Sequence, residues 1–385
     1  MTSMRDRPSS RTSAPEDAAS SAPSVPSGGR ASISDVARHA GVSTATVSRV
    51  LNRPSSVKAD KRQAVLQSCE ALGYVINGAA RALSSNRTYT IGAVVPTLAT
   101  QTFSRTLNVF QKRLHDAGYT LLLASSDFDP SIELDEVTKL LGHGVDALMV
   151  VGRTHDPKMW ERIDQRGVPC VQILTLDSTR PSIGYDNTAI GHLIADHLIQ
   201  LGHTDISVIV GTPPTNDRVA DRIRGMRKRL ASSGATLPRE RIVDNAFSLN
   251  EARAAAMKML EASNARPTAI VCGNDQLAFG VLLAAAAKGL RVPEDLSIVG
   301  FNNYDFAAHL TPALTTVSVD LAQLGAEAAD FLLRAIDKNA VASALPRIET
   351  ALIVRGSTAP APAKAPRRRQ KSTKAATSTI ETENA

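Results

Sequence analysis

The chain has 385 residues, with 44 Lys and Arg against 37 Asp and Glu and a formal net charge of +7 at pH 7. This length allows two or three domains, each with a core of its own. Its three cysteines, Cys69, Cys170 and Cys272, are far apart and form no CxxC pair, which favours a reducing compartment over a disulfide framework. No run approaches the roughly 18 apolar residues of a membrane span, and the N-terminal stretch lacks the apolar core of a signal peptide, so we expect a cytoplasmic protein with no membrane partner.

Both ends of the sequence are rich in Ser, Pro and Ala, and we expect residues 1–30 and 357–385 to be disordered. The C-terminal segment is also basic, with three consecutive arginines from Arg367 to Arg369. This composition is typical of a solubilising tail, although non-specific contact with DNA phosphates stays open.

Residues 30–90 form a basic segment, with nine Lys and Arg against three Asp and Glu. Residues 91–356 are slightly acidic, with 26 Lys and Arg against 29 Asp and Glu. A basic head on an acidic body indicates that the head meets a polyanion while the body has another task.

The stretch "SISDVARHAGVSTATVSRVLN", from Ser32 to Asn52, predicts a helix, a tight turn and a second helix. Ser32 is placed to cap the first helix with Asp35 three residues on, Gly41 allows the reversal, and Ser43 caps the second helix. The outward face of the second helix then carries Thr44, Ala45, Ser48, Arg49 and Asn52. Short hydroxyl side chains let this helix approach phosphates inside a major groove while the long arginine reaches a base edge. The alternative is that these hydroxyls only cap and solvate a small helix.

The motif "DVAxxAGVSxxTVSRVLN" resembles the N-terminal domain of the LacI/GalR family of bacterial transcriptional repressors. The resemblance implies a helix-turn-helix domain over residues 31–76. It places Thr44 and Ala45 at the variable positions that choose the operator sequence, and Arg49 where guanine is often read. Ala45 is then limited to contact with a thymine methyl group. Ser43, Thr46, Ser48 and Asn52 match positions that contact the DNA backbone.

Two further features follow from the same resemblance. Lys58 stands where the family usually has a Ser or Thr that caps the third helix. We therefore do not count on this cap, and we expect the lysine to add a partner for a DNA phosphate. Residues 77–89 correspond to a hinge helix and linker, in which Leu83 wedges into the minor groove with Ala80 beside it and Asn77 at the start. Because the segment is barely two turns long and contains Gly78, we expect it to be mostly unfolded until two subunits pair on DNA. A plain flexible linker is the alternative.

From residue 89 onward, short apolar runs alternate with amphipathic stretches. We predict strands at residues 90–96, 120–126, 146–152, 205–211, 268–273 and 296–301, and helices at residues 103–117, 188–201, 249–262 and 275–288. Strict alternation of this kind predicts an α/β core with parallel sheets covered on both faces. About 265 residues are too many for one sheet, so we expect two lobes with a ligand in the cleft between them, beyond the carboxyl ends of the strands.

The body also resembles the periplasmic sugar-binding-protein fold that this family uses as a sensor. The motifs are "IGYDNTAIG", "DRIRG", "CGNDQLAFG", "VPEDLSIVGFNN" and "LTPALTTV". The resemblance implies an effector-binding and dimerisation core over residues 90–356. Lobe one then covers about residues 90–185 and 319–348, and lobe two covers about residues 186–318 and 349–356.

Three residues stand out as effector partners by this resemblance. Arg222 matches the arginine that clamps the effector, and its planar fork suits a carboxylate or vicinal hydroxyls. Asp275 matches the acidic residue that accepts from sugar hydroxyls, and Phe247 an aromatic side chain on which a ligand ring stacks. The alternatives are a salt bridge of Arg222 with Asp221 or Asp217, an N-terminal helix cap for Asp275, and ordinary core packing for Phe247.

Further lining residues are expected from both lobes. Gln101 and Phe103 follow the first strand, and Arg218 and Asn303 are weaker candidates in the second lobe. The phrase "RTHDP" at residues 153–157 is reminiscent of the gluconate-repressor branch, whereas "QILT" at residues 172–175 lacks an acidic residue that many members have. We therefore favour a sugar or sugar acid over a purine.

An enzyme and a transport-binding protein are the competing classes. The body has no GxSxG, HExxH or glycine-rich phosphate loop, so we predict no catalytic residue, cofactor or metal. His192 and His197 are five residues apart and lie off one helix face, which argues against a shared metal. A transport-binding protein would not need residues 30–90. We expect a homodimer that binds double-stranded operator DNA, without the apolar heptads of a tetramer, and whether its effector releases or recruits DNA is left open.

Overall fold

The computed structural model describes residues 31–52, 54–75, 87–211, 216–244, 247–261, 266–337 and 345–362. It consists of two compact units, Met1–Thr88 and Tyr89–Ala385, which we call the head and the body. The predicted hinge residues Asn77, Ala80 and Leu83 lie outside the described residues, as do residues 1–30 and 363–385. No helix in the described part of the chain is long and apolar enough to cross a membrane.

The described part of the head contains three α-helices, α1 (Ile33–His39), α2 (Thr44–Asn52) and α3 (Ala59–Ala71), with a short 3-10 helix, η1 (Pro54–Ser56), between the last two. The predicted caps are confirmed. Ser32 and Asp35 form a reciprocal capping box, and the Ser43 hydroxyl accepts from the Thr46 amide at 3.2 Å. Gly41 reverses the chain with φ of +63°, a conformation that favours glycine. The small core consists of the buried side chains Val36, Ala37, Val47, Val50 and Val65.

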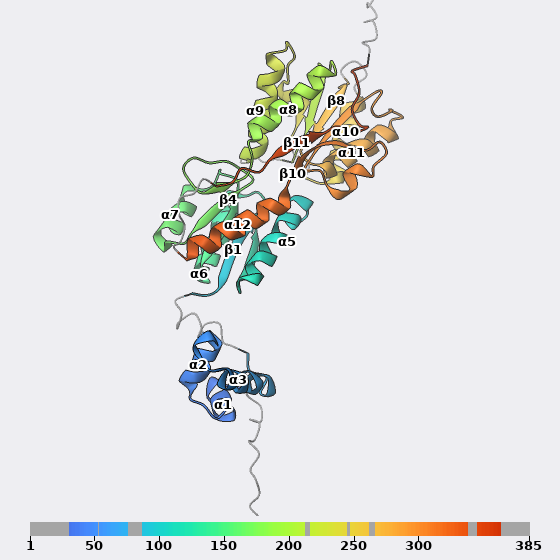
Figure 1. Cartoon of the computed structure of the whole chain (residues 1–385). Helices are drawn as coiled ribbons and strands as arrows, with labels where there is room; N and C mark the ends of the chain where they lie inside the picture. The colour runs from blue at the N-terminus through green and yellow to red at the C-terminus, as the bar shows by residue number, and fades with distance from the viewer. Residues whose placement is uncertain are drawn as a thin grey trace, which may run out of the picture. The chain divides into compact units, whose positions relative to one another are not determined.

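Lobe one of the body, which carries the labels β1 and β4 in Figure 1, is built on a parallel sheet. This sheet has five strands in the order β2-β1-β3-β4-β5. Its strands are β1 (Thr90–Val95), β2 (Thr120–Ser125), β3 (Ala147–Val151), β4 (Cys170–Ile173) and β5 (Ser182–Ile183). Its helices are α5 (Gln101–Asp116), α6 (Pro130–Gly142), α7 (Pro157–Arg166) and α12 (Leu321–Ile336), the last arriving from the far end of the sequence.

Lobe two is a six-stranded sheet in the order β11-β10-β9-β8-β6-β7. Its strands are β6 (Ile206–Ile209), β7 (Ile242–Val243), β8 (Ala269–Cys272), β9 (Ser297–Phe301), β10 (Thr315–Val319) and β11 (Thr350–Ile353). Its helices are α8 (Asn187–Gln200), α9 (Asp217–Ala231), α10 (Leu249–Glu261) and α11 (Asp275–Ala287), with 3-10 turns η2 (Arg239–Arg241) and η3 (Asp305–Ala308). Among the described strands, only the edge strand β11 runs antiparallel to its neighbour.

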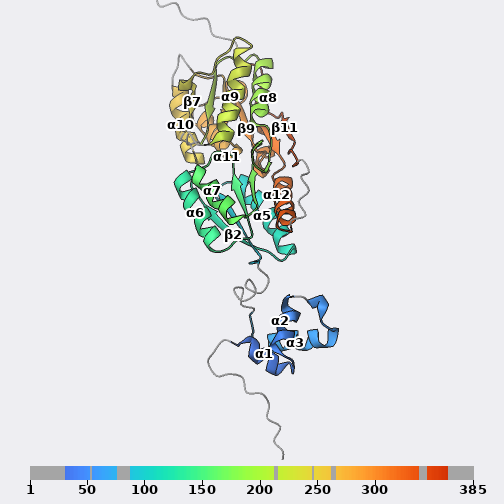
Figure 2. The ribbon, with the colours of Figure 1, turned by 90° about the vertical axis from the view of Figure 1, so that its left-hand side faces the viewer.

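Apolar side chains on both faces of the strands explain this layered arrangement. In β3, Met149 faces the core layer that holds α5 and α12, whereas Leu148 and Val150 face the layer under α6 and α7. In Figure 2, α6 and α10 lie on one side of the body and α5, α12 and α8 on the other. Every strand and helix that we predicted from residue 89 onward is present, with ends within two residues of the predicted ones.

The ordered body continues beyond residue 356, where we expected a disordered tail to begin. Ser357 is fully buried, and its hydroxyl donates to the carbonyl of Ile298 at 2.6 Å and accepts from the amide of Thr315 at 2.8 Å. Thr358 also contacts the ring of His197. Because these polar groups, and the amide of Ala361, are paired with lobe two, residues 357–362 belong to that lobe.

Candidate functional site

The outward face of α2 carries the predicted base-reading residues. Thr44, Ala45 and Arg49 are exposed, whereas Val47 and Val50 of the same helix are buried in the head core. The Arg49 guanidinium lies along the helix, with Nε donating to the carbonyl of Ala45 at 3.3 Å. The helix therefore presents one long cation between small side chains.

The side chains predicted to contact the DNA backbone form hydrogen bonds with one another at the start of α2 and along it. The hydroxyls of Ser43 and Thr46 are 3.0 Å apart, and the Asn52 amide donates to the Ser48 hydroxyl at 3.3 Å. Lys58 is the N-cap residue of α3, is exposed and makes no side-chain cap hydrogen bond. Its ammonium group is thus placed where an anion can reach it.

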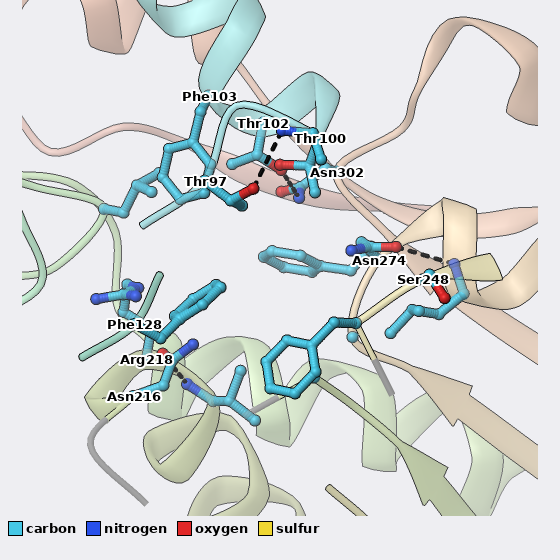
Figure 3. Close-up of a pocket in the computed structure, with 18 of the residues that line it drawn as sticks. Thr97, Thr100, Thr102, Phe103, Phe128, Asn216, Arg218, Ser248, Asn274 and Asn302 are labelled. Atoms are coloured by element: carbon cyan, nitrogen blue, oxygen red, sulfur yellow. Dashed lines mark hydrogen bonds between the residues drawn. The ribbon is translucent and has the colours of Figure 1, made fainter. Parts of the chain in front are cut away.

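A cavity of about 450 Å³ lies between the two lobes of the body (Figure 3). Lobe one contributes residues that follow β1, β2 and β4, and lobe two contributes residues that follow β6, β8 and β9. The cavity therefore lies at the carboxyl ends of strands in both sheets, as expected for parallel folds. Of the predicted effector residues, the lining includes Phe103, Arg218, Arg222 and Phe247.

Arg222 is a buried cation in the wall of this cavity. Its Nη1 donates to Asn187 Oδ1 at 2.6 Å, and its guanidinium lies 4.2 Å from the ring centre of Phe301. Burial lowers the pKa of Arg222 to about 10, so the side chain stays charged at neutral pH. The alternative salt bridge with Asp217 or Asp221 is wrong, because within the described ranges those carboxylates pair with other arginines.

Aromatic side chains cover the cavity from both lobes. Phe247 is 46% exposed, so the alternative of ordinary core packing is wrong, and its ring lies 5.7 Å from that of Phe128. Phe128 follows β2 in lobe one and was not predicted from the sequence. Its position after a strand of the sheet was the only available signal.

Three predicted effector residues do not line the cavity. Asp275 is fully buried, and its two oxygens accept from the Thr316 hydroxyl at 2.6 Å and the Tyr304 amide at 2.5 Å. Gln101 accepts from the amide of Asp305 at 3.4 Å, and Asn303 accepts from Arg355 at 2.8 Å. The polar groups of these three side chains form hydrogen bonds within the protein, which hold the neighbouring loops in place.

Asn274 and Asn302, which directly precede Asp275 and Asn303, line the cavity instead. Asn274 caps α11 by accepting from the Leu277 amide at 2.9 Å, and it lines the cavity (Figure 3). The cap that we considered for Asp275 therefore belongs to Asn274. Asn302 also lines the cavity. Burial raises the pKa of Asp275, which does not line it, to about 6.

Comparison with known proteins decides the family. Residues 32–77 match the model for bacterial regulatory proteins of the lacI family, and residues 195–358 match a periplasmic binding protein-like domain. The chain is 32% identical over 328 residues to catabolite control protein A of Priestia megaterium, covering 85% of this chain and 98% of that protein. The chain belongs to the LacI family.

Other similar proteins support this assignment. The transcriptional repressor PurR of Pectobacterium carotovorum is 32% identical over 339 residues, covering 86% of this chain and 98% of that one. The lac repressor dimer bound to operator and an anti-inducer superposes with a TM-score of 0.74 at 28% identity, covering 86% and 100% of the two chains. The regulator GntR of Chromobacterium violaceum superposes with a TM-score of 0.66 at 29% identity, covering 70% and 99%. These relatives are named as regulators, not as enzymes.

This LacI-family cavity also has a polar corner that was not predicted from the sequence. Thr102 Oγ1 lies 2.7 Å from the hydroxyl of Tyr304. It also accepts from the Asn302 amide nitrogen at 2.8 Å (Figure 3). Thr100 Oγ1 and Asn302 Oδ1 are buried and have no protein partner within the described ranges. Because buried polar atoms are nearly always paired, these two atoms suit a ligand that offers hydroxyl groups. No group of His, Cys, Asp and Glu in the described chain could hold a metal ion.

Proposed function

We propose that this LacI-family chain is a DNA-binding transcriptional regulator of the repressor type, whose operator binding is controlled by a sugar or sugar acid in the interlobe cavity. The observation that supports a sugar or sugar acid as the effector is the buried, charged guanidinium of Arg222 in the cavity wall. The protein works in the cytoplasm, where the DNA lies, and as a homodimer. The lac repressor structure, a dimer bound to operator, supports this assembly.

In the head, α2 enters the major groove and Arg49 reads a base edge. Thr44 contacts an adjacent position and Ala45 meets a thymine methyl, while the hydroxyls around them bind phosphates. A dimer presents two such helices to two half-sites, so the operator is close to a palindrome. The hinge assignment of Asn77, Ala80 and Leu83 to the minor groove is part of the same proposal.

In the body, the polar and charged groups of the cavity favour a ligand with both hydroxyls and a carboxylate. A buried guanidinium without a carboxylate partner is costly, and an anionic ligand group offsets that cost. The acceptors at Thr100 and Asn302 suit hydroxyl donors, and the aromatic faces of Phe128 and Phe247 suit an apolar face of a ring. A sugar acid meets all three requirements, whereas a neutral sugar leaves the charge of Arg222 unmatched.

The DNA-binding part is tested by selecting operator sequences from a random duplex pool with the full chain. We expect the selected sequence to contain two inverted half-sites, and Arg49→Ala to lose about 1–3 kcal/mol of discrimination at one base pair. Arg38→Ala is the matched control, because Arg38 is an exposed arginine of the same head that pairs with Asp35 on α1. Equal base preference in Arg49→Ala and Arg38→Ala would remove Arg49 from base reading.

The effector part is tested by thermal shift with matched pairs of a neutral sugar and its acid, such as D-glucose and D-gluconate. We expect stabilisation by an acid at concentrations above its Kd, and its loss in Arg222→Gln. Arg224→Gln is the matched control, because Arg224 lies on the same helix, is 62% exposed and pairs with Asp221. A neutral sugar that binds Arg222→Gln as well as the unsubstituted chain would contradict the role of Arg222.

A further inference from the structure

Arg153 forms an ion pair from one lobe of the body to the other. It follows β3 of lobe one, and its Nη1 lies 2.7 Å from Asp221 and 3.5 Å from Asp217, which both belong to α9 of lobe two. The carboxylate side chains are only 9% and 4% exposed, whereas Arg153 is 34% exposed. Asp217 also pairs with Arg218, and Asp221 with Arg224, both within lobe two. Because water screens these buried carboxylates poorly, removing their partner from lobe one has a larger effect than removing a surface pair.

Asp217 links this contact to the cavity. One carboxylate oxygen of Asp217 accepts from the backbone amide of Arg153 and from the Thr175 hydroxyl, both in lobe one and both at 3.2 Å. The other oxygen accepts from Arg218 Nη1 at 3.0 Å. Arg218 lines the cavity, so lobe one and a cavity arginine are held by the same carboxylate.

The residue before Arg153 is shaped for this contact. Gly152 has a φ of +84°, and a Cβ atom built there would lie 1.9 Å from Arg218 Nη1 and 2.6 Å from Asp217 Oδ1. Asp217 and Arg218 of lobe two therefore pack directly against the backbone of Gly152 in lobe one. His155 anchors the same loop, because its ring bonds to the carbonyl of Gly152 at 2.9 Å and to Glu133 of α6 at 2.8 Å. The first three residues of the "RTHDP" motif thus belong to a fixed interlobe loop.

We propose that Arg153 is a positioning residue of the effector cavity, which joins lobe one to α9 and, through Asp217, sets the position of Arg218 in the cavity wall. The proposal rests on the proposed function, in which the cavity holds the effector. Arg153 does not itself line the cavity. Its substitution therefore changes effector affinity without removing a ligand contact.

The first experiment measures the interlobe distance without any ligand. Spin labels are placed at Asp135→Cys on α6 and Lys258→Cys on α10, both exposed, in a full chain whose natural cysteines are replaced by alanine. Labelled chain is diluted with unlabelled chain, so that distances within one subunit are measured by pulsed electron paramagnetic resonance. We expect Arg153→Gln to broaden the distance distribution and Arg180→Gln to leave it unchanged.

Arg180→Gln is the matched control because Arg180 is 33% exposed and pairs with Asp164 at 2.7 Å inside lobe one. An unchanged distribution in Arg153→Gln would overturn the proposal whatever the cavity binds. Gly152→Ala is a second variant that displaces the same contact by its volume, and it should broaden the distribution too.

The second experiment measures the affinity of the full chain for D-gluconate by calorimetry. We expect about tenfold weaker binding in Arg153→Gln and Gly152→Ala, partial recovery in Arg153→Lys, and a change within about twofold in Arg180→Gln. Equal affinity in Arg153→Gln and the unsubstituted chain would contradict the link to Arg218. If D-gluconate binds no variant and not the unsubstituted chain, this sugar acid is excluded as the effector, while the distance measurement still decides the role of Arg153.

Discussion

The head and the body place their charged groups in opposite environments. In the head, Arg49 is exposed above a core of apolar side chains, and Ser68 is the only buried polar side chain among its described residues. The body instead buries Arg222, in the wall of the cavity, and Asp275, which does not line the cavity. The head therefore depends on the stability of a small apolar core, whereas the body depends on buried charges whose energies respond to pH and to a ligand.

The strongest test of this contrast is a charge placed in the head core. Val47 is fully buried, and an ionised carboxylate at that position costs at least about 3 kcal/mol, which a core of this size cannot supply. We expect Val47→Asp to unfold the head, abolish DNA binding and leave the body folded. Denaturant unfolding followed by circular dichroism should show the loss of one transition, because the two units are separate.

Ala45→Asp serves as the control, because it places the same charge on the exposed face of α2. It should keep the head folded while weakening DNA binding through repulsion from phosphates. A head transition that survives unchanged in Val47→Asp would contradict the view that its stability comes from this core.

A smaller effect on stability is expected when the buried carboxylate of Asp275 is removed from the body. Burial raises the pKa of Asp275 from 3.8 to about 6, so between these pH values the folded body holds a proton that the unfolded chain releases. This carboxyl group therefore makes the body less stable as pH rises from about 4 to about 6, with no further change above. The difference between the two pKa values corresponds to a loss of at most about 3 kcal/mol in the free energy of unfolding of the body.

Asp275→Asn should flatten this part of the profile. The amide stays neutral, keeps an oxygen for the Tyr304 amide and can donate to the Thr316 hydroxyl. Urea unfolding of the body between pH 4.5 and 7.5 measures the difference, which should favour the variant increasingly up to about pH 6 and stay constant above. Parallel profiles for the variant and the unsubstituted chain would show that Asp275 carries no such charge cost.

The body also shows how far sequence reasoning reaches. Its long strands and helices are predictable because sheets covered on both faces leave uninterrupted apolar runs, as in β3. The two-residue strands β5 and β7 are too short to show a period. The interlobe ion pair of Arg153 joins residues 64 and 68 positions apart, which no local pattern records.

In the cavity, the difference between a correct and an incorrect site residue is often one position. Asn302 and Asn303 both follow β9, with φ values of +90° and +47°, and these backbone angles decide which side chain lines the cavity. Likewise, Asn274 takes the helix cap, which leaves Asp275 pointing into the core. Sequence reasoning placed a polar residue at each strand end and could not choose between neighbours.

The smallest expected effect returns to the head. Ser32 caps α1, and its hydroxyl accepts from the amide of Asp35 at 3.3 Å and donates to that carboxylate at 2.7 Å. Ser32→Ala removes the hydroxyl, but the backbone amide of residue 32 still donates to Asp35. We expect the head to lose about 1 kcal/mol in its free energy of unfolding, with the transition of the body unchanged.

Ser34→Ala is the matched control, because Ser34 is exposed on the same helix and takes no part in the cap. DNA affinity of Ser32→Ala should fall only by the fraction of unfolded head, since the substituted residue lies on α1 and not on α2. A loss of affinity at temperatures where the head of the variant is fully folded would show that Ser32 contacts DNA directly. In that case the cap and the DNA-binding surface would share a residue, and the separation between core and surface in the head would be incomplete.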